Sequence, residues 1–79
     1  MLAEVVEHLV TGIVEHPEDV SVDERPTRRG PLVQVRVHPD DIGRVIGRAG
    51  RTATALRVVV NALSDSGPVR VDIVDLDGR

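Results

Sequence analysis

The order of structural elements in this chain can be worked out from one stretch, Asp41-Ile-Gly-Arg-Val-Ile-Gly-Arg-Ala-Gly-Arg-Thr-Ala-Thr-Ala-Leu56. At its centre lies Gly47-Arg48-Ala49-Gly50, and Arg51 follows directly. Glycine has no Cβ, so the backbone between two glycines can approach an anion closely. Apolar residues at helical spacing flank the glycines on both sides, so we expect two helices joined by a tight loop. The loop is therefore a candidate phosphate-binding site.

Two interpretations of the glycine loop remain open at this point. A plain corner between two packed helices would also use glycines, and a lone Gly-x-x-Gly is a weak signal. The spacing from Gly43 through Gly47 to Gly50 matches neither the dinucleotide fingerprint nor the Walker pattern. Arg48 and Arg51 favour the phosphate interpretation, because arginine forms strong charge-assisted hydrogen bonds with phosphate.

The segment before this stretch reads as one helix and two strands. Apolar residues at i, i+3, i+4 and i+7 predict an amphipathic helix over about residues 2–15, which Pro17 stops. Alternation predicts strands over 19–24 and 32–38, and the Pro- and Gly-rich stretch 25–31 predicts the loop between them. We expect the two strands to form a hairpin.

The segment from residue 39 onward completes an α+β domain. We expect helices over about 39–46 and 50–64 and a last strand over 69–74. The order α-β-β-α-α-β requires a crossover, so the last strand should lie parallel to the second in a three-stranded mixed sheet. The helices should cover one face of that sheet. We predict a single domain over residues 1–75 and a frayed tail over 76–79.

Charge is distributed unevenly along the 79 residues. The net charge is −3, yet residues 42–64 contain four arginines and no acid. That segment therefore carries +4 and the rest of the chain −7, as expected for an acidic body with one phosphate-facing edge. The chain has no Phe, Tyr or Trp, so bases cannot stack on aromatic side chains, and binding to single strands should be weak and loosely specific.

The motif Val45-Ile-Gly-Arg-Ala-Gly-Arg51 resembles the V-I-G-[KR]-x-G-[KR] core of KH domains, and the predicted element order is that of the type II KH fold. With His16-Pro-Glu-Asp19 before the hairpin and Pro39-Asp-Asp-Ile-Gly-Arg-Val-Ile-Gly47 before the loop, the chain resembles the KhpA family of small bacterial RNA-binding proteins. The resemblance covers about residues 1–74. It implies RNA binding, self-association, and partnership with a larger KH protein of the KhpB, or Jag, type.

The candidate site follows from the loop and this resemblance. We expect the backbone of the loop to clamp single-stranded RNA, and an apolar platform beside it to receive about four nucleotides. The hairpin loop corresponds to the variable loop that flanks the groove in type II KH domains; its arginines could equally be solvated. The expected RNA-binding residues are Gly47, Arg48, Ala49, Gly50, Arg51, Arg44, Ile42, Val45, Ile46, Arg28 and Arg29.

A protein-interaction adaptor is the alternative function. Val58, Val59 and Val60 point in three directions from one helix, which is more apolar surface than a single core face needs. We expect Val58 and Val59 to lie at a dimer contact, although scattered apolar surface is common. The RNA-binding hypothesis predicts a post-transcriptional regulator or RNA chaperone, and the adaptor hypothesis predicts a protein that acts mainly through assembly.

Several other classes receive little support from the sequence. Asp40 and Asp41 could form an acid–base pair, but their place in the first turn of a helix explains them. The histidines at 8, 16 and 38 lack metal-ligand spacing, so we expect surface or capping roles, no metal and no cofactor. No nucleophile constellation indicates an enzyme. The absence of a signal peptide and of any apolar run near 20 residues predicts a cytoplasmic protein.

Overall fold

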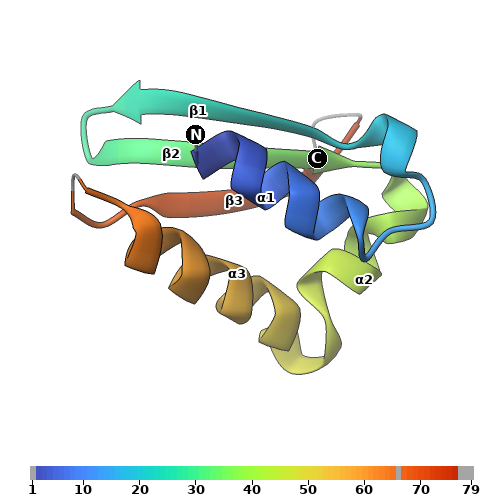
Figure 1. The fold of residues 1–79 in the computed structure, drawn as a ribbon. Helices are drawn as coiled ribbons and strands as arrows, with labels where there is room; N and C mark the ends of the chain where they lie inside the picture. Colours follow the sequence, from blue (N-terminus) through green and yellow to red (C-terminus); the bar gives the residue numbers. More distant parts are fainter. Residues whose placement is uncertain (1, 66, 77–79) are drawn as a thin grey trace.

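The computed structural model describes residues 2–65 and 67–76. It contains α1 (Leu2–Thr11), β1 (Ser21–Thr27), β2 (Gly30–Val37), α2 (Ile42–Ile46), α3 (Arg51–Leu63) and β3 (Arg70–Asp75). Three short 3-10 turns connect them, at η1 (Pro17–Asp19), η2 (Pro39–Asp41) and η3 (Arg48–Gly50). The predicted order α-β-β-α-α-β is confirmed (Figure 1).

The sheet has the order β1-β2-β3, with β2 in the centre. β1 runs antiparallel to β2, and β3 runs parallel to it, as the crossover required. Val35 of β2 lies opposite Val22 of β1 and Ile73 of β3, so these three side chains share one face of the sheet. The helices pack against this face, α1 over β1 and β2 and α3 over β3 (Figure 1).

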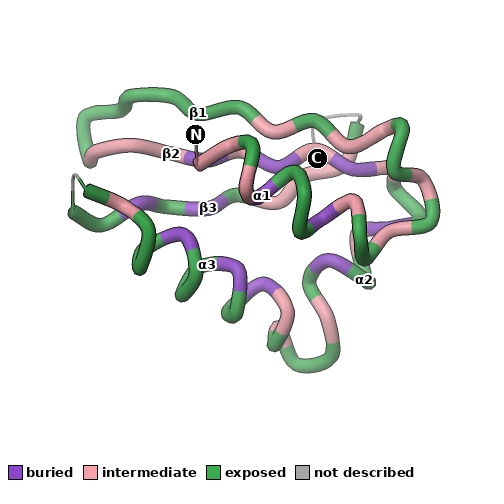
Figure 2. The backbone as a smooth tube through the Cα atoms, viewed as in Figure 1, coloured by how far each residue is buried: buried purple, intermediate pink, exposed green. Residues whose placement is uncertain are grey.

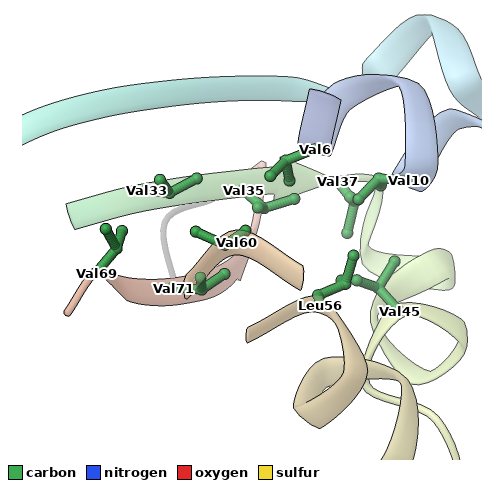
Figure 3. Packing of buried hydrophobic residues seen from close by; sticks show 10 residues of the cluster. All are labelled: Val6, Val10, Val33, Val35, Val37, Val45, Leu56, Val60, Val69 and Val71. Carbon is green, nitrogen blue, oxygen red and sulfur yellow. The ribbon is translucent and has the colours of Figure 1, made fainter. Parts of the chain in front are cut away.

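The core lies between the sheet and the helices and is built almost entirely from valine. Alternate residues of β2 point inward, and Val33, Val35 and Val37 are fully buried, as predicted. Figure 2 shows buried positions along the sides of the strands and helices that face each other. The buried apolar cluster in Figure 3 consists of Val6, Val10, Val33, Val35, Val37, Val45, Leu56, Val60, Val69 and Val71.

The first helix is shorter than predicted, because it ends at Thr11 and not near residue 15. Gly12 lowers helix propensity at this point. Beyond it, the N–H groups of Glu15 and His16 donate to the carboxylate of Asp41 at 3.1 and 3.0 Å. These long-range hydrogen bonds replace the helical ones that would continue α1.

The predicted loop over 25–31 is also wrong in length. Residues 25–27 extend β1 and residues 30 and 31 begin β2, so the turn consists of Arg28 and Arg29 alone. Pro26 is tolerated because β1 is an edge strand, where prolines within sheets are usually found. The expected tail over 76–79 lies mostly outside the described residues.

Candidate nucleic-acid interface

The glycine loop connects α2 to α3 through a backbone that only a few residue types adopt readily. Three of its four residues have positive φ: Gly47 at 78°, Ala49 at 56° and Gly50 at 73°. Gly47 is required for a second reason, since a Cβ there would lie 2.9 Å from the backbone nitrogen of Thr52. Gly47 is therefore required by this loop, whereas at Gly50 glycine avoids the conformational cost of a positive φ.

Hydrogen bonds within the loop leave two of its N–H groups available. The N–H of Gly47 donates to the Gly43 carbonyl at 2.9 Å, and that of Gly50 donates to the Gly47 carbonyl at 3.0 Å. Within the described part of the chain, the N–H groups of Arg48 and Ala49 have no acceptor. The 13-residue helix α3 begins directly after the loop, so its positive dipole end faces the same region.

The arginines around the loop differ in how they are engaged. Arg48 and Arg51 are exposed and form no ion pair with any described residue. Arg44 donates to the Glu15 carboxylate at 2.6 Å, and its Nε lies 3.9 Å from Asp41. Arg48 and Arg51 therefore offer uncompensated charge, whereas the charge of Arg44 is partly neutralised by its partners.

Of the three predicted apolar platform residues, one is exposed, one is half-buried and one is buried. Ile46 is 38% exposed and Ile42 is half-buried. The platform role of Val45 is wrong, because its side chain is completely buried against the sheet (Figure 3). Val45 occupies the inward position of α2 and holds this short helix on the core.

Arg28 and Arg29 do not lie beside the glycine loop. They form the hairpin turn, and neighbouring contacts place that turn at the start of β3: Arg70 Nη2 donates to Thr27 Oγ1 at 2.7 Å. This is the end of the domain where α3 stops, whereas the glycine loop is where α3 begins (Figure 1). A helix of 13 residues is about 20 Å long, so the two groups do not form one compact site.

The predicted dimer residues lie on the outer side of α3. Val58 is 64% exposed and Val59 38%. Leu63, which was not among the predicted residues, is also exposed, at 52%. Arg57, on the same helix, instead turns toward the sheet and donates to the Val71 carbonyl at 3.4 Å. This leaves α3 with an uncharged, apolar outer surface around Val58.

One side-chain cluster beside the interface was missed by the sequence analysis. Asp41 is only 1% exposed and accepts three hydrogen bonds: from the N–H groups of Glu15 and His16 and, at 3.1 Å, from His16 Nδ1. The His16 ring stacks on the His38 ring with centroids 4.0 Å apart. His38 Nδ1 in turn accepts from the N–H of Asp40 at 3.0 Å and caps η2.

The environment of this cluster shifts the pKa values of His16 and Asp41. The hydrogen bond from its ring to Asp41 raises the pKa of His16 above its ordinary value of 6.5, against a smaller opposing effect of burial. Burial by itself would raise the pKa of Asp41, but the hydrogen bonds from Glu15 and His16 outweigh burial and hold that pKa below 3.8. Asp41 is therefore a structural carboxylate, and the acid–base pairing with Asp40 has no support from its geometry.

A metal role for the two histidines does not fit the geometry of the cluster. Donor atoms of His16, His38 and Asp40 lie within 4.8 Å of one another. The two rings are stacked with planes 13° apart, however, so in-plane lone pairs of the two rings lie in separate, nearly parallel planes and do not converge on one ion. Zinc needs lone pairs that converge at about 2.0–2.1 Å from each nitrogen. The structural role of His38 as a cap agrees with the sequence prediction, but its contact with His16 was not foreseen.

No helix in the described ranges is long and apolar enough to cross a membrane.

Comparison with known proteins places this geometry in a family context. Residues 3–75 match the sequence model "KhpA/KhpB, KH domain". RNA-binding protein KhpA of Streptomyces coelicolor is 62% identical over 77 residues, covering 98% of this chain and 96% of that protein. The protein of the same name from Mycobacterium tuberculosis is 57% identical and covers 98% and 95%. The one from Halalkalibacterium halodurans is 47% identical over 72 residues.

Two solved structures share the fold at low sequence identity. Era in complex with MgGDPNP and nucleotides of 16S ribosomal RNA aligns with a TM-score of 0.60 and 14% identity. Aquifex aeolicus Era bound to GDP and AlF4− aligns with a TM-score of 0.60 and 16% identity. The chain is covered to 94% in both cases, but it spans only 29% and 30% of those proteins. This likeness concerns the fold alone.

Proposed function

Because the chain belongs to the KhpA/KhpB family of KH-domain proteins, we propose that it binds single-stranded RNA through the loop Gly47–Gly50 and acts as a post-transcriptional regulator or RNA chaperone without catalysing a reaction. The observation that carries the proposal is the loop itself. Among the described residues, no acceptor is found for the N–H groups of Arg48 and Ala49, which lie at the start of α3. The side chains of Arg48 and Arg51 form no ion pair with described residues. Relatives that cover nearly the whole chain are named RNA-binding proteins.

The binding mode follows from the chemistry of these groups. Phosphate oxygens accept hydrogen bonds from the N–H groups of Arg48 and Ala49, and the side chains of Arg48 and Arg51 add charge. Ile42 and Ile46 form a small apolar surface for the sugar and base of neighbouring nucleotides. Without aromatic side chains, the domain lacks the stacking energy of about 1–3 kcal/mol per base. Backbone contacts therefore dominate, and sequence preference is low.

Salt dependence tests this mode directly. Each phosphate contacted on a single strand contributes a slope of about −0.7 to the plot of log affinity against log salt. For about four clamped nucleotides we expect a slope of about −2 to −3, measured by fluorescence anisotropy with a labelled oligonucleotide. A slope near zero would contradict phosphate binding. A DNA oligonucleotide of the same sequence, measured in parallel, shows whether the 2′-hydroxyl contributes.

The adaptor function remains a second candidate, supported by the outer surface of α3. Val58, Val59 and Leu63 are exposed apolar side chains on one helix, and no acid lies between Arg51 and Leu63. We propose that this surface mediates contact with a second copy of the chain or with a KH protein of the KhpB type. Two linked domains would raise RNA affinity through effective concentration without a new contact.

Val58→Asp is expected to weaken self-association at least about tenfold, because it places a charge at the centre of the apolar surface. Sedimentation velocity over a range of concentrations gives the dissociation constant of the dimer. Leu76→Asp is the matched control, since Leu76 is an apolar residue directly after β3, away from α3 in the sequence, with 43% exposure. The surface assignment is wrong if the control variant dissociates as strongly, or if the native chain is monomeric at every concentration.

A further inference from the structure

The side chain of Thr52 lies directly against the backbone of the glycine loop. Thr52 is the second residue of α3, and a Cβ on Gly47 would collide with its Oγ1 and lie 2.9 Å from its Cβ. The peptide bond that follows Gly47 carries the N–H of Arg48, for which the described residues provide no acceptor. Thr52 Oγ1 therefore lies close to the position that we assign to a bound phosphate.

The hydroxyl of Thr52 has no partner in the part of the chain that the structure describes. Thr11 and Thr27 donate from their hydroxyls to main-chain carbonyls, but Thr52 Oγ1 forms no hydrogen bond with a described residue. Its side chain is half-buried, between exposed Arg51 and buried Ala53. A nucleotide bound at the loop would cover this hydroxyl, and a covered hydroxyl needs a hydrogen-bond partner in place of water.

The other groups that the loop offers to a nucleotide are donors only. The N–H groups of Arg48 and Ala49 and the guanidinium groups of Arg48 and Arg51 donate to phosphate oxygens, but they cannot accept a hydrogen bond. A hydroxyl both donates and accepts. A nucleotide group that donates a hydrogen bond at this position therefore finds its acceptor in Thr52.

In RNA, the donor closest to a backbone phosphate is the ribose 2′-hydroxyl. The carbon that bears it is bonded to the carbon that carries the 3′-phosphate ester, so it lies beside a clamped phosphate whatever the base. The 2′-hydroxyl donates and accepts, and it lets a protein distinguish RNA from DNA. We propose that Thr52 Oγ1 hydrogen-bonds to the 2′-hydroxyl beside the clamped phosphate and gives the domain a preference for ribose over deoxyribose. This contact rests on the proposed binding of single-stranded RNA at the loop.

The contact selects the sugar and leaves the base unread. Thr52 belongs to the first turn of α3, beside the backbone clamp, and the chain has no aromatic side chain on which bases could stack. The expected ligand is therefore single-stranded RNA of any sequence, with DNA of the same length bound more weakly. A packing role alone would need only the branched shape of the Thr52 side chain against Gly47 and would make no such distinction.

Valine in place of Thr52 separates packing from hydrogen bonding, because it keeps the β-branched shape and removes the hydroxyl. We expect the native chain to bind a short RNA about two- to tenfold more tightly than DNA of the same sequence, the range for one net hydrogen bond. In Thr52→Val, the affinity for RNA should fall to that for DNA, while the affinity for DNA stays native. Fluorescence anisotropy gives the four dissociation constants, with oligonucleotides of A, C and G alone so that uracil and thymine do not differ.

Two further variants make the test specific. Thr52→Ser keeps the hydroxyl and should keep the preference for RNA, whereas Thr54→Val removes an exposed hydroxyl of α3 and should bind both oligonucleotides as the native chain does. An equal loss of RNA and DNA affinity in Thr52→Val, or an unchanged ratio, would overturn the contact. Equal binding of RNA and DNA by the native chain would overturn it and leave RNA binding at the loop intact. Binding of neither would overturn the proposed function and this contact with it.

Discussion

Replacing both Arg48 and Ala49 by aspartate is expected to weaken the binding of single-stranded RNA about 10- to 100-fold at low salt. The substitutions remove one positive charge and place two carboxylates where phosphate oxygens would accept hydrogen bonds from the loop. Hydrogen bonds to charged groups contribute about 1.5–3 kcal/mol each, which corresponds to this range. Fluorescence anisotropy with a short labelled RNA gives the dissociation constant.

The fold should survive this double substitution. Both positions are exposed, and Ala49 has a φ of 56°, a region that aspartate enters more readily than most residues. Arg28→Asp with Arg29→Asp is the charge control, since it makes a larger change in net charge at the opposite end of α3. An equal loss in both double variants would mean that overall charge, and not the loop, determines binding. Native affinity in the loop variant would disprove the site.

Replacing Asp41 by alanine is expected to lower the melting temperature by more than about 8 °C, the shift that small domains show for a loss of one to two hydrogen bonds. The variant leaves the N–H groups of Glu15 and His16 without their acceptor and frees His16 from its partner. Because a 79-residue domain is only marginally stable, this single carboxylate is a major determinant of folding. Circular dichroism at 222 nm follows the transition.

Asp40→Ala is the matched control, because its carboxylate is adjacent in sequence but 78% exposed. We expect a shift of less than about 2 °C for this exposed site. The pH dependence gives a second check. The lowered pKa of Asp41 means that its stabilising contribution is present at neutral pH and is lost only as the pH falls through its folded pKa, below 3.8. Equal melting temperatures for Asp41→Ala and the native chain would refute the structural role.

The sequence patterns were sufficient for the order of elements and for the loop. Alternation over Val33, Val35 and Val37 identified the central strand, since the side-chain period of a strand is two and is visible locally. The glycines at 47 and 50 indicated the tight turn, because their backbone conformation depends on their own lack of Cβ. The uneven distribution of arginine marked the basic edge. The resemblance of the Val45–Arg51 motif to the KhpA family agrees with the match of residues 3–75 to the KhpA/KhpB KH-domain model.

Tertiary structure decided which side chains these elements present and which they hide. Val45 and Ile46 are adjacent and equally apolar in the sequence, but only packing against the sheet shows that Val45 is buried and Ile46 is exposed. From the sequence, Arg28 and Arg29 could equally flank the groove or be solvated, and the folded chain places them at the end of α3 opposite to the glycine loop. Helical spacing alone did not distinguish Val45 from Ile46, because the five-residue helix α2 is too short for its periodicity to define one face.

The cluster around Asp41 shows most clearly what the amino-acid sequence determined and what required the folded chain. As local sequence, His38-Pro-Asp-Asp41 indicates a helix start, and that part was confirmed. The partner of Asp41, His16, lies 25 residues away, and no periodic pattern connects the two. Their contact exists because α1 and α2 pack on the same face of the sheet and bring the two segments together. Secondary structure depends on neighbours in the chain, whereas a buried charge depends on neighbours in space.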